Sequence, residues 1–473
     1  MRFRCHINLS NQTHKMQTNT TIAAICTGRG GAISVLRVSG NDALKIVSKI
    51  FKPLKKGFSL DTDAEANRIY NGYIIDGNGN EIDRVVISVY LAPHSYTGED
   101  VVEISCHASS YIQGVILTRL FKYGAQFAKP GEFTRRAFQN KKMDLSQAEA
   151  VADLIASKSK AEHDIAVNQM RGGITQEIKR LRDLLLKFTS LMELELDFSE
   201  EDVEFADRSQ LKAILQETEN YLSRLVGSFR LGNAIKNGIP VAICGEPNAG
   251  KSTLLNALLN DERAIVSDIP GTTRDVLEDF LNINGVTYRL IDTAGIRSTD
   301  DQIELLGIDR AKNAISKAEI VLIVLNPQND INQQFSGIIP DDFPRKKIIA
   351  VVNKSDVCAD VDVSMLPPET SVVKISAKHK TNITELFAKI SELGAADYNQ
   401  DEVILTNVRH FTIFSEALAS VQRAETALES GLSGEFVSQD IRDALRSFAE
   451  ITGDEITTDE VLGNIFKNFC IGK

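Results

Sequence analysis

The sequence predicts a multidomain protein in which mixed α/β regions alternate with helical ones. The chain has 473 residues, enough for about three domains at roughly 150 residues each. The spacing of apolar residues changes along the chain, from alternating runs typical of strands to the spacing of helices and back. Helical spacing then returns near the C-terminus, so two helical segments flank a central block.

Composition and charge exclude several protein classes. Hydrophobic residues make up 43% and charged residues 25% of the chain, which is typical of globular domains and not of collagen-like, coiled-coil or wholly disordered chains. The net charge of −11 excludes a wholly basic nucleic-acid coat but allows a local basic patch. The six cysteines form no Cys-x-x-Cys pair, and no apolar run approaches the ~20 residues that span a bilayer. We therefore expect a cytoplasmic protein with no membrane partner.

The N-terminal part reads as an extension followed by an α/β domain. Residues 1–20 lack the apolar stretch of a signal peptide and are expected to form an extension. Residues 21–141 contain short β-rich runs such as AISVLRV and RVVISVY together with two helical stretches. The sequence DGNGN at residues 76–80 indicates a β-hairpin, because Gly and Asn tolerate positive φ angles.

Two helical segments are predicted, over residues 142–237 and 397–473. In the first, Leu211, Leu215 and Leu222 share one helical face after two candidate caps, Asp207 and Ser209. The simplest arrangement is one discontinuous helical domain into which residues 238–396 are inserted. The sequence leaves open whether the two helical segments pack together.

The central block carries a phosphate-binding motif. Gly245–Ser252 reads GEPNAGKS, matches GxxxxGK[ST], and lies between an apolar run and a helical stretch. In this motif backbone N–H groups surround phosphate oxygens, Lys251 reaches the outer phosphates and Ser252 can ligate Mg²⁺. The nucleotide contacts expected here are Asn248, Ala249, Gly250, Lys251, Ser252 and Thr253.

Three further motifs follow, each behind its own predicted strand. DTAG places the Asp292 carboxylate at the end of a strand that faces the Mg²⁺ site. NKSD supplies Asp356, which can accept hydrogen bonds from guanine, whereas adenine offers no such pair of donors. With SAK as a loop at the base, the four motifs resemble the translation-factor-like GTPases and predict GTP binding. The contacts expected are Asp292, Thr293, Ala294, Gly295, Asn353, Lys354, Asp356, Ser376, Ala377 and Lys378.

The residue after DTAG departs from the Ras-like pattern. It is Ile296, where Ras-like proteins have the glutamine that orients water. Because isoleucine cannot hydrogen-bond to water, another polar group or a cation must assist hydrolysis. Glu304 could polarise water, although taken alone it reads equally well as a solvated charge.

The segment SDIPGTTRD at residues 267–275 offers oxygen atoms to a cation. A potassium ion bound there and at Asn248 could take the place of an arginine finger. Thr272 and Thr273 suit a switch loop that closes on Mg²⁺ and the γ-phosphate. The nucleotide contacts expected in this segment are Ser267, Asp268, Ile269, Pro270, Gly271, Thr272 and Thr273.

Both ends of the chain resemble one family. PGEFTRRAFQNKKMDLSQAEAVADLI at residues 130–155, SYTGEDVVE, GTTRD and the terminal FCIGK are similar to the MnmE/TrmE tRNA modification GTPases, from about Thr21 to Lys473. The resemblance implies an N-terminal α/β domain that binds folate and forms a homodimer. It also implies a discontinuous all-helical domain with an inserted, potassium-activated, P-loop Ras-like α/β G domain. This multidomain α/β and α fold agrees with the order of blocks above.

The resemblance further implies a reaction and partners. Family members act with an FAD-containing partner of the MnmG/GidA family, as a heterotetramer. Together they install an aminomethyl-type group, carboxymethylaminomethyl or aminomethyl, on C5 of the wobble uridine of certain tRNAs. The implied cofactors are GTP, Mg²⁺, K⁺ and 5,10-methylenetetrahydrofolate, with 5-formyltetrahydrofolate as an analogue and FAD on the partner.

Residue roles are carried over at matching positions. The implied folate contacts are Arg37, Glu103, Lys142 and Lys473, which without the family match would read as ordinary surface charges. The implied potassium ligands are Asn248, Ser267, Ile269 through its carbonyl, and Thr272; those of Mg²⁺ are Ser252 and Thr273. The implied catalytic residues are Glu304, Thr273, Arg274 and Cys470, and the chemical step of Cys470 stays open.

One departure and two alternatives accompany the resemblance. CTGRGG at residues 26–31 is about two residues shorter than the family's usual segment, which weakens the expectation of folate affinity. A ribosome-assembly switch GTPase shares the G motifs, but no KH-like module with a GxxG loop follows Lys378. Prenylation at Cys470 is disfavoured because Gly472 is not aliphatic and Lys473 is an unusual last residue.

A basic cluster near residue 140 is a candidate contact for tRNA phosphates. A solvated basic turn is an equal alternative. The cluster consists of Arg135, Arg136, Lys141 and Lys142.

Overall fold

The chain folds into two units. The computed structural model describes residues 20–28, 30–197, 207–261, 279–291, 313–336, 338–339, 347–358, 361–364, 366–395, 402–454, 462, 465–467 and 469–472. The first unit is Met1–Ala148 with Ile456–Lys473, and the second is Glu149–Glu455. The finer domain boundaries at residues 20, 141, 237 and 396 stay predictions.

The first unit is built on a seven-stranded sheet with the order β3-β4-β5-β6-β2-β1-β7. Its strands are β1 (Ile22–Ile25), β2 (Ile33–Ser39), β3 (Phe51–Pro53), β4 (Arg68–Ile75), β5 (Glu81–Tyr90), β6 (Val101–His107) and β7 (Gln126–Phe127). Neighbouring strands are antiparallel except β1 and β7. Its helices are α1 (Ala43–Ser48), α2 (Leu60–Asp63), α3 (Ser110–Lys122) and α4 (Glu132–Gln139).

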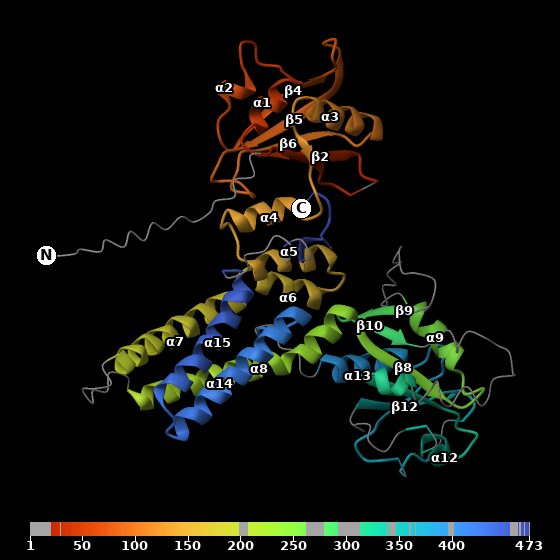
Figure 1. The fold of residues 1–473 in the computed structure, drawn as a ribbon. Coiled ribbons are helices and arrows are strands. Elements are labelled where there is room, and N and C mark those ends of the chain that lie inside the picture. Colours follow the sequence, from red (N-terminus) through yellow and green to blue (C-terminus); the bar gives the residue numbers. More distant parts are fainter. Residues whose placement is uncertain are drawn as a thin grey trace. The chain divides into compact units, whose positions relative to one another are not determined.

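One apolar core holds this unit together. Leu36 and Ile104 on the sheet share it with Val47 of α1 and Leu120 of α3. Figure 1 shows the helices α1 and α3 beside this sheet. The hairpin predicted at DGNGN is confirmed, because it joins β4 to β5. There the Asp76 carboxylate accepts hydrogen bonds from backbone N–H groups two and four residues later, at 2.8 Å each.

The C-terminal segment belongs to the first unit. Leu462 and Phe466 are buried with Leu145 and Ala148 in a small apolar cluster. The helical part predicted over residues 397–473 stays a prediction, and within it the structure groups Ile456–Lys473 with the N-terminal unit. The physical reason is that its apolar side chains find their partners there.

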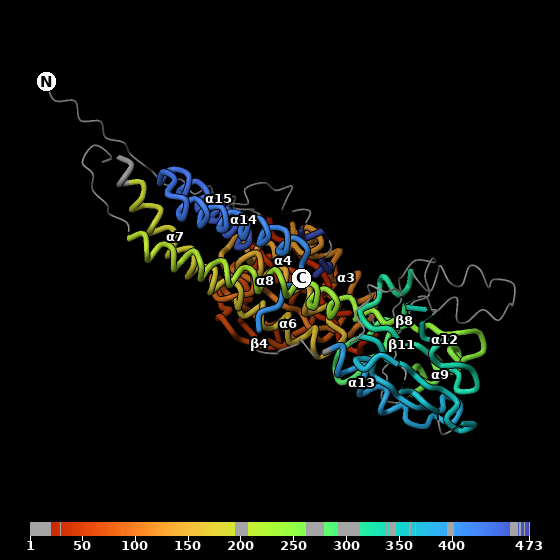
Figure 2. The backbone as a smooth tube through the Cα atoms, turned by 90° about the horizontal axis from the view of Figure 1, so that it is seen from below, coloured from red at the N-terminus to blue at the C-terminus, as the bar shows by residue number. Residues whose placement is uncertain are grey.

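The helical part of the second unit is a bundle made from both flanks of the insertion. It contains α5 (Leu145–Ala156, from Glu149 on), α6 (Lys160–Met170), α7 (Gly173–Asp197), α8 (Arg208–Asn237), α14 (Val408–Glu429) and α15 (Gly434–Thr452). Figures 1 and 2 show α7, α8, α14 and α15 side by side. Leu185 and Leu215 share one core with Phe414 and Phe448, so the helical segments pack together.

The start of α8 agrees with the predicted cap. Asp207 accepts a hydrogen bond from the N–H of Ser209 at 2.9 Å, and the Ser209 hydroxyl donates to the same carboxylate at 2.6 Å. Of the two candidate caps, Asp207 therefore caps the helix.

The inserted part of the second unit is a six-stranded sheet with the order β13-β12-β11-β8-β10-β9. Its elements are β8 (Ile239–Gly245), α9 (Lys251–Leu259), β9 (Asp279–Ile283), β10 (Val286–Ile291), β11 (Ile320–Leu325), α12 (Ile331–Ser336), β12 (Ile348–Val352), β13 (Ser371–Lys374) and α13 (Ile383–Ala395). Only the β9–β10 pair is antiparallel among these strand pairs. Apolar clusters cover both faces of the sheet.

The predicted multidomain α/β and α fold is confirmed. Within the described ranges, no helix is both long enough and apolar enough to cross a bilayer.

Candidate functional site

The phosphate loop has the predicted order of strand, loop and helix. β8 ends at Gly245 and α9 begins at Lys251. Gly250 has φ 96°, and a Cβ atom on it would lie 2.2 Å from the side-chain nitrogen of Asn353. Only glycine fits such a position, so the loop can curl tightly before the helix. The N-terminus of α9 therefore follows directly on the loop, and the N-terminus of a helix favours the binding of phosphate groups.

Lys251 lies over this loop. Its Nζ atom donates hydrogen bonds to the carbonyls of Gly245 at 2.9 Å and Glu246 at 2.8 Å. Burial lowers the pKa of the Lys251 ammonium below its ordinary value. The loop carbonyls thus hold the positive group beside the phosphate cradle.

Asn353 connects the phosphate loop to the base-side loop. Its amide nitrogen donates to the carbonyl of Ala249 at 2.9 Å, and its amide oxygen accepts from the N–H of Ala377 at 3.0 Å. All three residues are buried. The NKSD and SAK motifs meet at this point, as their positions behind neighbouring strands β12 and β13 predict.

Asp356 lies beside the same base-side loop. A hydrogen bond from Ser376 is the largest influence that lowers the pKa of this carboxyl, and the charges of His379 and Lys378 act in the same direction. Nε2 of His379 lies 3.7 Å from an Asp356 oxygen. The carboxylate is therefore an ionised acceptor at neutral pH, as recognition of guanine N–H groups requires.

Some of the other predicted G-domain residues lie in the described part of the chain, and others lie outside it. Asn248 is exposed and has φ 61°, a left-handed conformation that asparagine tolerates. Ser252 and Thr253 are exposed in the first turn of α9, and Lys354 has φ 59°. The predicted residues that lie outside the described part of the chain are Ser267, Asp268, Ile269, Pro270, Gly271, Thr272, Thr273, Arg274, Asp292, Thr293, Ala294, Gly295, Ile296, Glu304 and Lys473.

In the first unit, Arg37 and Glu103 form a cross-strand ion pair. They face each other in the β2–β6 register, with Nε and Nη2 of Arg37 at 2.9 and 2.8 Å from Oε1 of Glu103. The guanidinium carbon lies 5.1 Å from the ring centre of Tyr96 and 5.5 Å from that of Phe133. Nη1 of Arg37 is buried and has no hydrogen-bond partner among the described residues. Tyr96 and Phe133 were not predicted as site residues, although both lie in the segments SYTGEDVVE and PGEF.

The C-terminal tail contacts strand β1, which pairs with the strand that carries Arg37. A Cβ atom on Gly472 would lie 2.4 Å from the carbonyl oxygen of Ile25, and the residue before Ile25 is paired with Arg37 across the sheet. Cys470 is exposed, and its backbone carbonyl accepts a hydrogen bond from Gly131 at 3.2 Å.

Lys142 bonds elsewhere. Its Nζ donates to the carbonyl of Pro93 at 2.8 Å, and within the described ranges no hydrogen bond or ion pair joins it to Arg37 or Glu103. The structure therefore joins two of the predicted folate contacts, Arg37 and Glu103, by an ion pair. The third, Lys142, bonds to Pro93 instead.

Arg136 corrects one prediction. Only 2% of its side chain is exposed, and it forms ion pairs with Glu99 at 3.1 Å and Glu132 at 3.0 Å. It also donates to the backbone carbonyl of Thr20 at 2.7 Å. A guanidinium that is buried and ion-paired in this way cannot face tRNA phosphates, so the basic patch predicted near residue 140 is wrong for Arg136.

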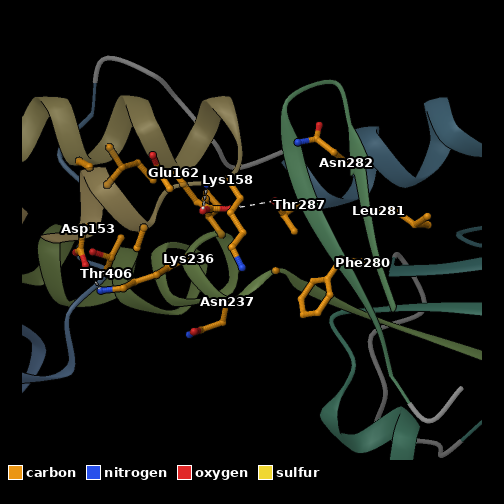
Figure 3. Close-up of a pocket in the computed structure, with 16 residues that line it drawn as sticks. Asp153, Lys158, Glu162, Lys236, Asn237, Phe280, Leu281, Asn282, Thr287 and Thr406 are labelled. Atoms are coloured by element: carbon orange, nitrogen blue, oxygen red, sulfur yellow. Dashed lines mark hydrogen bonds and ion pairs between the residues drawn. The ribbon is translucent and has the colours of Figure 1, made fainter. Parts of the chain in front are cut away.

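The second unit contains a cavity of about 390 Å³. It lies between α5, α6, the end of α8 and the β9–β10 hairpin (Figure 3). Its lining includes Asp153, Glu162, Lys236, Phe280 and Thr287, and none of the predicted nucleotide or folate residues. It is therefore distinct from the phosphate loop.

Two family models match most of the chain. The family described as "GTP-binding protein TrmE N-terminus" matches residues 21–142, and "MnmE helical domain" matches residues 145–470. A solved structure of the G domain of the FeoB iron transporter from T. maritima is 27% identical, with a TM-score of 0.24, and covers 33% of this chain and 98% of that one.

Several curated relatives are each named tRNA modification GTPase MnmE. The relative from Parabacteroides distasonis is 52% identical over 463 residues, covering 96% of this chain and 100% of the relative. Those from Bacteroides thetaiotaomicron and Flavobacterium johnsoniae are 51% and 48% identical, covering 96% and 97% of this chain and 99% and 100% of the relatives. These matches confirm the predicted resemblance and set the ribosome-assembly alternative aside. The chain belongs to the MnmE family of tRNA modification GTPases.

Proposed function

We propose that this GTPase hydrolyses GTP with the aid of K⁺ and acts with an FAD-containing partner of the MnmG/GidA family. The product is a tRNA whose wobble uridine carries an aminomethyl-type group on C5, with a tetrahydrofolate as the one-carbon donor. The observation that carries the folate part is the buried Nη1 atom of Arg37, which lacks a hydrogen-bond partner among the described residues. A buried guanidinium donor without a partner is costly, so a ligand acceptor at this point would be stabilising.

The residues around Arg37 suit a pteridine with a glutamate tail. Glu103 fixes the guanidinium of Arg37 and can accept hydrogen bonds from N–H groups of the ligand. The rings of Tyr96 and Phe133 lie close to the same guanidinium and help to fix its orientation. Lys142 and Lys473 are the proposed cations that pair with the carboxylates of the folate's glutamate tail. When bound there, tetrahydrofolate supplies a one-carbon unit to the reaction. We further propose that Cys470, exposed on the nearby tail, acts in the modification step.

In the G domain each motif has a proposed task. Lys251 now donates hydrogen bonds to two loop carbonyls, and when the nucleotide binds it donates to phosphate oxygens instead. Asp356 accepts hydrogen bonds from the N–H groups of guanine. Glu304 positions the attacking water. The proposed ligands are Ser252 and Thr273 for Mg²⁺, and Asn248, Ser267, Ile269 and Thr272 for K⁺; Arg274 is a proposed catalytic neighbour.

The first unit also supports the proposed homodimer. Ile69 lies in the same cross-strand row as Glu103 and Arg37, and Val86 and Ile33 lie on the same face by their register. Ile69 is 66% exposed, Val86 37% and Ile33 66%. A second copy of this face would bury them beside the Arg37–Glu103 pair.

Titration calorimetry with 5-formyltetrahydrofolate tests the folate proposal. We expect Arg37→Gln to weaken binding at least tenfold, because the substitution removes a charge-assisted donor. Arg68→Gln is the matched control, since Arg68 pairs with Glu65 on the exposed end of β4. Equal affinity of the Arg37→Gln variant and the wild type would contradict the proposal.

GTP turnover in KCl and NaCl tests the cation proposal. We expect faster turnover in KCl, and we expect Asn248→Gly to abolish the difference, because glycine keeps the left-handed backbone and removes only the amide. Asn382→Gly is the matched control, since Asn382 has φ 58° in the same domain. Equal rates of the wild type in the two salts would exclude the potassium role.

A further inference from the structure

The turn between β9 and β10 caps helix α6 of the helical part. The carbonyl of Gly285 accepts a hydrogen bond from the N–H of Ala161 at 3.0 Å. Ala161 lies in the first turn of α6, where N–H groups have no partner within the helix. Asn284 and Gly285, with φ 53° and 80°, form the tight turn that presents this carbonyl. A strand hairpin of the inserted sheet therefore completes a helix of the bundle.

A side-chain contact lies beside this backbone bond. The Thr287 hydroxyl on β10 donates to the Glu162 carboxylate at 3.0 Å, as Figure 3 shows. The same carboxylate accepts from the Ser159 hydroxyl at 2.8 Å and from the N–H of Lys158 at 2.8 Å. Glu162 thus belongs to the cap of α6, and Thr287 is the group that the hairpin adds to it.

The hairpin is joined to the nucleotide site at both ends. GTTRD, with Thr273, precedes β9 in the chain, and Asp292 of DTAG directly follows β10. β10 also pairs in parallel with β8, whose last residue, Gly245, opens the phosphate loop. In GTPases the segments that contact the γ-phosphate and Mg²⁺ rearrange when the nucleotide changes, so a change of nucleotide would reach the hairpin through its two ends and through β8.

We propose that the β9–β10 hairpin is a nucleotide-sensitive cap on α6, in which Gly285 and Thr287 make the contacts. Replacement of GDP by GTP loosens these contacts, so that the N–H of Ala161 loses its partner, the carbonyl of Gly285. By linkage, an interaction that stabilises α6 in its capped position also favours the GDP-bound arrangement of the hairpin. This role goes beyond the proposed potassium, folate and partner functions and requires only that the chain binds guanine nucleotides.

Hydrogen exchange of the full chain tests the proposal. The probe is the peptide that contains residues 160–163, compared with GDP and with a non-hydrolysable GTP analogue. We expect this peptide of the wild type to exchange faster with the analogue. We expect Thr287→Val to exchange at the faster rate with both nucleotides, because the hairpin that presents the Gly285 carbonyl to Ala161 then loses its bond to Glu162, while the helix's own cap of Ser159 and Glu162 stays intact. Equal exchange of the wild type with the two nucleotides would overturn the proposal, as would a normal nucleotide response in Thr287→Val.

A glycine pair separates the contact from general strain. Gly285→Ala places a Cβ atom 3.0 Å from that of Lys160, whereas Gly431→Ala, at φ 63°, meets nothing within 4 Å. Both substitutions strain a left-handed turn, but only the first pushes on α6. We expect Gly285→Ala alone to abolish the nucleotide response of residues 160–163. The same effect from Gly431→Ala would overturn the proposal, because the response would then follow from general strain.

Discussion

The Nε2 atom of His410 lies 2.6 Å from a carboxylate oxygen of Glu149, and the two residues are 261 positions apart. Arg409 donates to the same carboxylate at 3.0 and 2.9 Å. Glu149 precedes the inserted domain and the other two residues follow it. This buried polar cluster therefore ties together the two halves of the discontinuous helical region.

We predict that Glu149→Gln destabilises the protein by about 3 kcal/mol at pH 7, because it removes the charged carboxylate to which the Arg409 guanidinium and the His410 ring both bond. Burial opposes ionisation of Glu149, but the charge and hydrogen bond of His410, with those of Arg409, outweigh it and lower the pKa from 4.5 to about 2. A carboxyl with a lowered pKa contributes stability above its unfolded pKa, and this contribution is lost as the pH falls from about 4.5 towards 2.

Urea unfolding at pH 7 and pH 3 measures the effect of Glu149→Gln. The difference from the wild type should shrink at pH 3. Glu416→Gln, on the exposed face of α14, is the control and should cost less than about 0.5 kcal/mol. A difference between wild type and Glu149→Gln that is the same at both pH values would contradict the assigned role.

Asn353→Ala should weaken GDP and GTP binding at least tenfold. It leaves the buried Ala249 carbonyl and Ala377 N–H without partners, at about 1–3 kcal/mol for each group. The phosphate loop and the base-side loop then lose their connection. Fluorescence titration with a labelled nucleotide measures the change, with Asn332→Ala, near the start of α12, as the control. Unchanged affinity would show that the two loops are held by other contacts.

Asp356→Asn should weaken GTP binding and improve binding of xanthosine triphosphate. The new amide donates a hydrogen bond where guanine's amino group needs an acceptor, whereas xanthine offers a carbonyl there. Competition between the two nucleotides for the variant measures the ratio of affinities. A preference for GTP as strong as that of the wild type would show that Asp356 does not contact the base.

Glu304→Ala should slow GTP hydrolysis about 100-fold and leave nucleotide affinity unchanged, as expected for a residue that only positions water. Single-turnover hydrolysis and a binding titration separate the two effects. Glu385→Ala, exposed in the first turn of α13, is the control. A loss of affinity equal to the loss of rate would assign Glu304 to binding instead.

Features that depend on neighbouring residues were predictable from the sequence. The order of β8, loop and α9 follows from the spacing of GEPNAGKS and its flanks, and the Asp76 hairpin and the Asp207 cap follow from local hydrogen bonding. Contacts between distant segments were not predictable. The Asn353–Ala249 bond spans 104 positions, and the contact of Gly285 with α6 joins two different parts of the fold.

Burial was the other quantity that the sequence did not supply. Arg136 looked like one of four basic residues in an exposed turn, but its partner Glu99 lies 37 positions away and the Arg136 side chain is buried. Apolar periodicity likewise indicated a helix near Phe466 without showing that its partners are Leu145 and Ala148. In both cases the partner, and not the residue itself, decides the role.

Nucleoside mass spectrometry of total tRNA tests the central claim most directly. Cells depleted of this protein would be compared with the same cells expressing the wild type, Arg37→Gln or Cys470→Ser. The account predicts that a C5-modified wobble uridine disappears on depletion, returns with the wild type and fails to return with Arg37→Gln. A nucleoside profile that is unchanged by depletion would contradict it.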